Sequence, residues 1–269
     1  MFSIQQTLTS LLIFSVIFAV LDKLFSFHKQ KIFRREWGTD LCFFLGQYLL
    51  WSTTSLIALS WVSDFVGGMG LQNFQQMVQS QPLWLQIFEV ILLCDIGIYW
   101  GHRISHKYEI LWRFHKVHHT SEKLDWIAAY REHPLDNIYT RVIENLPAML
   151  MGFPLELIAG LIMLRGLWGL VIHSNCDFNL GIFKYVLGSP RLHHWHHELE
   201  HSGKVNFANL MPLMDVIFGT YHDPEEKPEK YGIPEDVSHN YVVQIVSPLI
   251  PGFMKKRRQK LRDSVTISE

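Results

Sequence analysis

Histidines gathered at three places constrain this chain more than any other feature. Eleven of the fifteen histidines lie in residues 102–119, in residues 193–201, or at His173 between them. Imidazole is the commonest metal ligand among protein side chains. Residues three or four positions apart share one face of a helix. We therefore expect three helical segments that turn several imidazoles toward one point.

The spacing within these segments selects eight histidines, and the lone His173 makes nine candidate metal ligands and catalytic residues. They are His102, His106, His115, His118, His119, His173, His193, His196 and His197. This number exceeds the needs of a single ion and predicts two metal ions with open coordination positions. A redox-capable site rich in imidazole favours iron, although zinc, copper and nickel also accept this ligand. His194 falls on the other side of its helix, and we expect it to support the site without binding metal.

Apolar runs with few charges predict membrane helices in the first hundred residues. Three such runs occupy residues 8–27, 41–63 and 83–101. About 20 apolar residues suffice to cross a bilayer. The third run carries Asp95, and an ionisable residue in a membrane helix points to a function. We expect Asp95 to accept the second N–H of a ligand imidazole; an ion pair with Arg103 or Arg113 is the alternative.

A fourth apolar stretch covers residues 142–172 and is interrupted by Pro147 and by the Gly-Phe-Pro sequence at 152–154. Proline ends or kinks a helix because it lacks the backbone N–H and its ring clashes with the preceding turn. We therefore expect a helical hairpin, either re-entrant or a short membrane span, which returns the chain to the side it left. A buried hairpin in a water-soluble fold is the alternative.

The distribution of basic residues predicts the orientation. The loop at 29–35 is rich in Lys and Arg, which is typical of the cytoplasmic side, whereas the loop at 64–82 has neither. The histidines then lie at the cytoplasmic face. The expected fold class is an all-α integral membrane protein with about four transmembrane helices, or three plus a re-entrant hairpin. A cytoplasmic helical cap would hold the dinuclear, histidine-rich metal site.

This organisation predicts three regions along the chain. They are the N-terminal transmembrane helices at 1–101, a catalytic region at 102–222 that includes the hairpin, and a C-terminal loop and tail at 223–269. The tail contains a basic run at 255–262. We expect this run to contact anionic lipid. Nucleic acid is not an expected partner, since the net charge of the whole chain is −1.

Three short sequences carry a resemblance to a known family. HRISH at 102–106, HKVHH at 115–119 and HHWHH at 193–197 resemble the histidine boxes of the fatty acid hydroxylase superfamily, also called the sterol desaturase family. The flanking sequences resemble it as well, over about residues 90–222. REHPLD at 131–136 resembles a segment that often follows the second box.

The resemblance implies a membrane-bound, non-haem di-iron enzyme. Such an enzyme uses O2 and two electrons to hydroxylate or desaturate a C–H bond of a lipid, such as a sterol, a fatty acyl chain or an ether lipid. Carried onto this chain, it implies two iron ions bound by the nine histidines named above. His133 is then a tenth ligand or a residue on the substrate side, and the extra His194 could shift the register of the third box by one. Electrons would come from a separate protein, cytochrome b5-like, a ferredoxin or a reductase.

Two functions of other classes fit the histidines less well. A zinc-dependent membrane hydrolase would activate water without a reductant, but the chain has no HExxH motif and more imidazoles than such a site needs. A metal-binding or transport protein without chemistry would need ligands along a membrane path, whereas these are expected at one face. Both hydroxylation and desaturation fit the sequence.

Overall fold

The computed structural model describes residues 3–201, 203–235 and 237–250. Within these ranges the chain is helical, and its β-structure is limited to two isolated β-bridges. The basic run at 255–262 lies outside the described residues. The helices are α1 (Ile4–Phe25), α2 (Trp37–Gly46), α3 (Ser52–Gly67), α4 (Gln72–Gln79), α5 (Leu83–Lys107), α6 (Glu109–His115), α7 (Pro134–Met151), α8 (Leu155–His173), α9 (Pro190–His197), α10 (Leu213–Ile217) and α11 (Tyr241–Val246).

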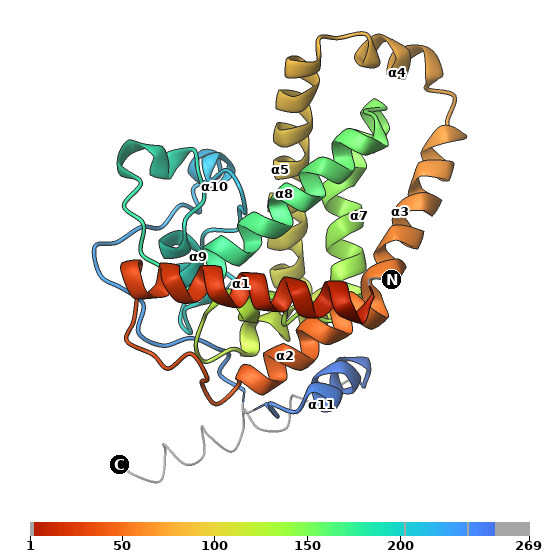
Figure 1. Cartoon of the computed structure of the whole chain (residues 1–269). Helices are drawn as coiled ribbons and strands as arrows, with labels where there is room; N and C mark the ends of the chain where they lie inside the picture. Colours follow the sequence, from red (N-terminus) through yellow and green to blue (C-terminus); the bar gives the residue numbers. More distant parts are fainter. Residues whose placement is uncertain (1–2, 202, 236, 251–269) are drawn as a thin grey trace.

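Four stretches are long and apolar enough to cross a membrane. They are Ile4–Phe25, Trp37–Gly67, Leu83–Lys107 and Leu155–His173. The second stretch joins α2 to α3 through a π-helical turn at Gln47–Trp51, where the chain changes direction. Figure 1 shows α3, α5 and α7 running along one another, with α4 connecting α3 to α5, while α1 runs across the view. The three helices predicted in the first hundred residues are therefore present, and α5 continues far enough to carry His102 and His106.

The hairpin predicted at 142–172 is present but longer than expected, because α7 begins at Pro134. The chain turns at Gly152, whose φ of 82° lies in the left-handed region that glycine tolerates. The expectation of a break at Pro147 is wrong, since this proline lies inside α7. Pro147 cannot donate to the carbonyl of Ile143, four residues earlier.

Close packing of α5 on α7 explains why this helix continues. A Cβ on Gly97 would lie 2.7 Å from the Ile143 carbonyl oxygen, so the absent side chain leaves room for that carbonyl. Gly101 is equally close to the side chain of Ile143. Small residues of this kind let helix backbones approach in membrane proteins. The contact places α7 directly against the helix that delivers the first histidines.

Aromatic packing connects α1 and α2 to the segment after the second histidine box. Trp126 stacks on Phe18 of α1 with ring centroids 5.7 Å apart, and Phe44 of α2 lies edge-on to it. Ile127 and Leu170 complete this buried cluster. The cluster fixes the chain between the second box and α7 against three helices.

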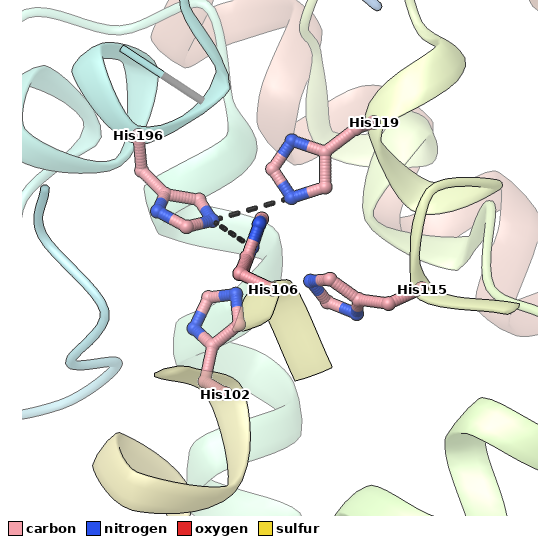
Figure 2. A group of neighbouring side chains, drawn as sticks. All are labelled: His102, His106, His115, His119 and His196. Atoms are coloured by element: carbon pink, nitrogen blue, oxygen red, sulfur yellow. Dashed lines mark hydrogen bonds between the residues drawn. The ribbon is translucent and has the colours of Figure 1, made fainter. Parts of the chain in front are cut away.

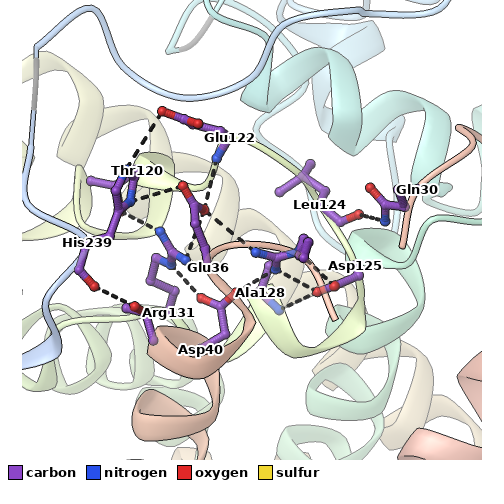
Figure 3. A network of polar contacts seen from close by, with 12 residues as sticks. Gln30, Glu36, Asp40, Thr120, Glu122, Leu124, Asp125, Ala128, Arg131 and His239 are labelled. Carbon is purple, nitrogen blue, oxygen red and sulfur yellow. Dashed lines mark hydrogen bonds and ion pairs between the residues drawn. The ribbon is translucent and has the colours of Figure 1, made fainter. Parts of the chain in front are cut away.

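A buried ion-pair network lies beside this cluster (Figure 3). Arg131 is fully buried and donates to Asp40 at 2.5 Å, to Glu36 at 3.1 Å and to Thr120 at 3.2 Å. Arg34 donates both to Asp40 and to Asp125, and its Nε lies 2.8 Å from Asp125 Oδ2. His239 Nδ1 lies 3.0 Å from Glu36 Oε1. Thr120 directly follows the second box, so the network ties that box to α2 and to the C-terminal part of the described chain.

Candidate metal centre

Five structural elements deliver the nine candidate ligands to one place. His102 and His106 lie one turn apart at the end of α5, His115 ends α6, and His173 ends α8. His118 and His119 lie on a 3-10 turn at His118–Thr120. The last three, His193, His196 and His197, lie on α9.

The second box differs from the continuous helical face that its spacing predicts. Helix α6 ends at His115, and the next residues tighten into a turn in which Thr120 N–H donates to the Val117 carbonyl at 3.2 Å. A 3-10 turn advances about 120° per residue, against 100° for an α-helix. His118 is thereby directed away from its neighbours His115 and His119. Side chains of the same box consequently point to two different places in the structure.

The histidines form two separate groups. One holds His102, His106, His115, His119 and His196, and the other holds His118, His173, His193 and His197. Within each group, one nitrogen of every ring lies within 4.8 Å of those of all the others. Figure 2 shows the five rings of the first group converging from α5, α6, the 3-10 turn and α9.

The ring nitrogens in the centre of each group face one another. In the first group, His196 Nε2 lies 3.2 Å from Nε2 of both His106 and His119. In the second, His173 Nε2 lies 3.0 Å from His118 Nε2 and 2.9 Å from His193 Nε2. These nitrogen–nitrogen distances are compatible with several nitrogen atoms surrounding one shared metal ion.

The outer ring nitrogens of five of the nine histidines are bound to acceptors, which fixes the tautomer of those rings. Nδ1 donates to a backbone carbonyl in His102 (Phe207, 2.7 Å), His118 (Arg131, 3.2 Å), His173 (Gly169, 2.7 Å) and His196 (Val205, 2.8 Å). His115 Nδ1 instead donates to Asp136 Oδ2 at 2.9 Å. A neutral imidazole carries one N–H, so Nε2 of these rings presents a lone pair.

Converging lone pairs require a cation between them. Nε2 of His102 and of His115 are buried without a hydrogen-bond partner in the described chain. Burial lowers the pKa of His119 and His197 well below the ordinary value, so their rings are neutral. Neutral imidazoles whose outer N–H is held by a carbonyl or carboxylate are the usual form of metal-bound histidine. The donor set therefore fits two transition-metal ions.

Asp95 does not contact the imidazoles as expected from the sequence. Its Oδ1 lies 2.6 Å from Nη1 of Arg165 on α8, a residue that the sequence analysis did not single out. Arg103 and Arg113, the predicted alternatives, form no ion pair with it in the described chain. The physical reason is position, because Asp95 lies two turns before His102 on α5. The carboxylate that accepts from a clustered histidine is Asp136, which sequence reasoning missed although it belongs to the REHPLD segment.

His133 and His194 lie outside both groups. His133 caps α7, its Nδ1 accepting from Leu135 N–H at 3.1 Å and its Nε2 donating to the Ile245 carbonyl at 2.9 Å. Both of its nitrogens are hydrogen-bonded, and it belongs to neither histidine group, so the arrangement does not favour it as a tenth ligand. His194 contacts the Tyr231 hydroxyl at 2.9 Å and the Ser174 carbonyl at 3.1 Å. It anchors α9 next to His173, and the register of the third box does not shift.

A cavity of about 390 Å³ opens beside the histidines. His102, His115, His118, His173 and His193 form one end of its lining. The cavity extends between α7 and α8, where polar and charged side chains line it together with apolar ones. Among them is Glu132, whose pKa is raised by burial to about 7. A substrate in this cavity would lie directly against both groups.

Comparisons with known proteins agree with these observations. The model of the fatty acid hydroxylase family matches residues 87–220. The ornithine lipid hydroxylase OlsE of Rhizobium tropici is 30% identical over 183 residues, which is 66% of this chain and 54% of that protein. Human alkylglycerol monooxygenase is 29% identical over 180 residues, 63% of this chain and 40% of that protein. The Delta(7)-sterol 5(6)-desaturase ERG3A of Gibberella zeae is 29% identical over 153 residues, 54% and 40% of the two chains.

The chain spans about half the length of the curated relatives it matches, or somewhat less. No solved structure matches it. The matched residues 87–220 include all nine histidines of the two groups as well as Asp136 and Glu132.

Proposed function

Because residues 87–220 belong to the fatty acid hydroxylase family, we propose that this protein is a membrane-bound oxidoreductase that uses O2 and two electrons to hydroxylate or desaturate a C–H bond of a lipid. The observation that carries the proposal is the convergence of nine histidines in two groups whose inner nitrogens present lone pairs. The relatives named above include lipid hydroxylases, monooxygenases and sterol desaturases.

We assign the metal ions as two irons, one bound by each histidine group. Iron supplies the activation of O2 and the oxidation of an unactivated C–H bond. Asp136 and the carbonyls of Phe207, Arg131, Gly169 and Val205 hold the ligand rings in orientation through their Nδ1–H groups. Six of the nine rings are buried, which limits the access of bulk water to the reacting atoms.

The lipid reaches the histidines through the cavity between α7 and α8. Met163 and Leu167 of α8 line the cavity and are exposed on the surface of a helix long and apolar enough to cross a membrane. Four such helices and the family match identify a multi-pass membrane protein. The basic loop at 29–35 supports a cytoplasmic position for the histidine end of the bundle. Electrons come from a separate donor protein of the cytochrome b5, ferredoxin or reductase type.

The test is metal analysis and O2 uptake on iron-loaded protein in lipid nanodiscs with a competent reductant. We expect about two irons per chain, and O2 consumption accompanied by a lipid product that has gained one oxygen or lost two hydrogens. A protein that binds zinc and hydrolyses lipid without reductant would contradict the oxygenase proposal. Tight binding of two metals with no lipid conversion under any reductant would instead support a metal-binding protein without catalytic activity.

A further inference from the structure

Charged side chains of three helices, α5, α7 and α8, meet beside the cavity. Arg165 of α8 contacts Asp95 of α5 at 2.6 Å and Glu144 of α7 at 3.3 Å. Arg141 of α7 donates to the second oxygen of Glu144 at 3.0 Å. Two carboxylates and two guanidinium groups thus balance one another, and this cluster needs no charge from a ligand.

Glu132 also lines the cavity, but its carboxylate takes no part in these ion pairs. Its Oε2 accepts from the side-chain amide of Asn137 at 2.5 Å, and Asn137 is held in turn by Ser55 at 2.6 Å. No Lys, Arg or His of the described residues lies within ion-pair distance of it. The side chain is half-buried and lines the cavity. A carboxylate in such a place is costly unless a hydrogen-bond donor or a cation meets it.

Residues close to Glu132 in the sequence contact the histidine centre. The carbonyl of the preceding residue, Arg131, accepts from His118 Nδ1, and Asp136 one turn later accepts from His115. The segment therefore holds one histidine of each group while Glu132 reaches the cavity between them. A group bound to Glu132 would place its neighbouring carbon atoms near both metal sites.

Both polar and apolar side chains line the cavity. Asn137, Thr140 and Arg141 of α7 line it together with Glu132. Met163 and Leu167 of α8 and Phe14 of α1 supply apolar side chains to the same lining. At roughly 30 Å³ for each group the size of a water molecule, a cavity of 390 Å³ holds a headgroup and the adjoining atoms of a lipid.

We propose that Glu132 binds a hydrogen-bond-donating headgroup of the lipid substrate, an amine or a hydroxyl, so that the oxidised C–H bond lies near the headgroup rather than deep in an alkyl chain. This inference rests on the proposed lipid oxidation and adds its substrate class. Glu132 selects the headgroup, Arg141 and Arg165 keep the remaining charges neutralised, and the apolar side chains accept the start of the acyl chains.

The experiment compares three lipids with the same two oleoyl chains: a diacylglycerol with a free hydroxyl, its 3-amino analogue, and its 3-O-methyl ether, which donates no hydrogen bond. Binding to metal-loaded protein is measured without O2, from the lipid-dependent rise in melting temperature in detergent. We expect the amine and the alcohol to bind on the order of tenfold more tightly than the ether, the amine most tightly, because hydrogen bonds to charged groups are the strong ones.

Variants at Glu132 separate charge from hydrogen bonding. Glu132→Gln should abolish the preference for the amine, on the order of tenfold, and Glu132→Leu should abolish the preference for both donors. The matched control is Glu156→Gln, an exposed carboxylate at the far end of α8, which should behave as wild type. Equal binding of the three lipids by the wild-type protein would overturn the proposal even if a variant failed to fold, as would an unchanged preference in Glu132→Leu.

O2 uptake on the same lipids distinguishes failure of lipid oxidation from failure of headgroup selection. Oxidation of all three lipids at equal rates would support the oxygenase and overturn the headgroup selection. A headgroup preference without any O2 uptake would contradict the oxygenase while supporting Glu132 as the headgroup site. For a lipid that binds and reacts, mass spectrometry of the product should place the change within a few bonds of the headgroup, and a change near the chain terminus would contradict the proposal.

Discussion

The histidine centre and the ion-pair network around Arg131 are both buried and polar, yet they are satisfied in opposite ways. In the network, each guanidinium meets carboxylates at hydrogen-bond distance, so opposite charges within the chain complete it. In the centre, neutral rings turn lone pairs toward one another, and no positive side chain lies among them. Ion pairs between side chains of the folded chain hold the network together, whereas the centre presents lone pairs that a metal ion would bind.

The difference assigns separate tasks to two regions that are joined through the second histidine box. Arg131 belongs to both, since its side chain forms the network and its carbonyl holds His118. Stability comes from one region and chemistry from the other. Substitutions in the two regions should therefore respond differently to metal, and the predictions below use that response.

The largest effect is expected for loss of a ligand. His193→Ala removes one ring of the four-histidine group, and we expect iron to fall from about two to about one or fewer per chain and lipid oxidation to fall more than about 100-fold, beyond the effect typical of groups that only orient ligands. Metal analysis and product formation measure this. The matched control is His201→Ala, a partly exposed histidine outside both groups that pairs with Glu198; equal losses in the two variants would refute the assignment.

Removal of Arg131 should damage the fold more than the metal sites. Arg131→Met removes the guanidinium that Asp40 and Glu36 share and leaves Arg34 as the one arginine facing three carboxylates, and loss of one partner of a buried ion pair costs about 3–5 kcal/mol of unfolding free energy. Equilibrium unfolding in mixed detergent measures it, with exposed Arg35→Met as the control. Added metal should not restore the lost stability. Full rescue by metal would show that the network and the centre are not separate.

A smaller effect is expected where a side chain holds a ligand ring. Asp136→Asn weakens the acceptor for His115 Nδ1–H, and outer groups of this kind contribute about 10–100-fold in metal affinity. Competition with a chromogenic chelator measures the affinity. Exposed Asp64→Asn should leave it unchanged, and an Asp136→Asn variant that binds metal as tightly as wild type would contradict the role.

The smallest effect concerns the cap of α7. Burial lowers the pKa of His133, so its neutral ring contributes stability that is full above the unfolded value of about 6.5 and is lost as the pH falls below it. A protonated ring cannot accept from Leu135 N–H. Asparagine is a good N-cap without this titration. The melting temperature of His133→Asn should therefore fall less than that of wild type between pH 7.5 and 5.5, and identical slopes would contradict the prediction.

Local patterns in the sequence predicted the helices and the set of clustered histidines, whereas distant contacts determined the rest. Spacing of three and four residues placed rings on common faces, and long apolar runs marked α1, α3, α5 and α8. The partner of Asp95 is Arg165, 70 positions away, and Arg131 finds Asp40 at a separation of 91. Such pairs depend on how helices pack, which one sequence does not display.

The second histidine box shows the same limit at short range. A helix through His119 would have kept His115, His118 and His119 together, but α6 ends at His115 and the following turn separates them. Within the REHPLD segment, sequence reasoning singled out only His133, as a tenth ligand or a residue on the substrate side, and neither of the two carboxylates. In the structure, Asp136 accepts from His115 and orients its ring, and Glu132 lines the cavity.

The division of each box between the two groups has a consequence for assembly. His196 and His197 are neighbours on α9 but belong to different groups, as do His118 and His119. An ion that settles in one group therefore fixes the backbone that carries ligands of the other. The entropy of ordering these segments is lost once, with the first ion, so the second ion binds a prepared site. Metal uptake should be cooperative, with chains holding two ions or none and few holding one.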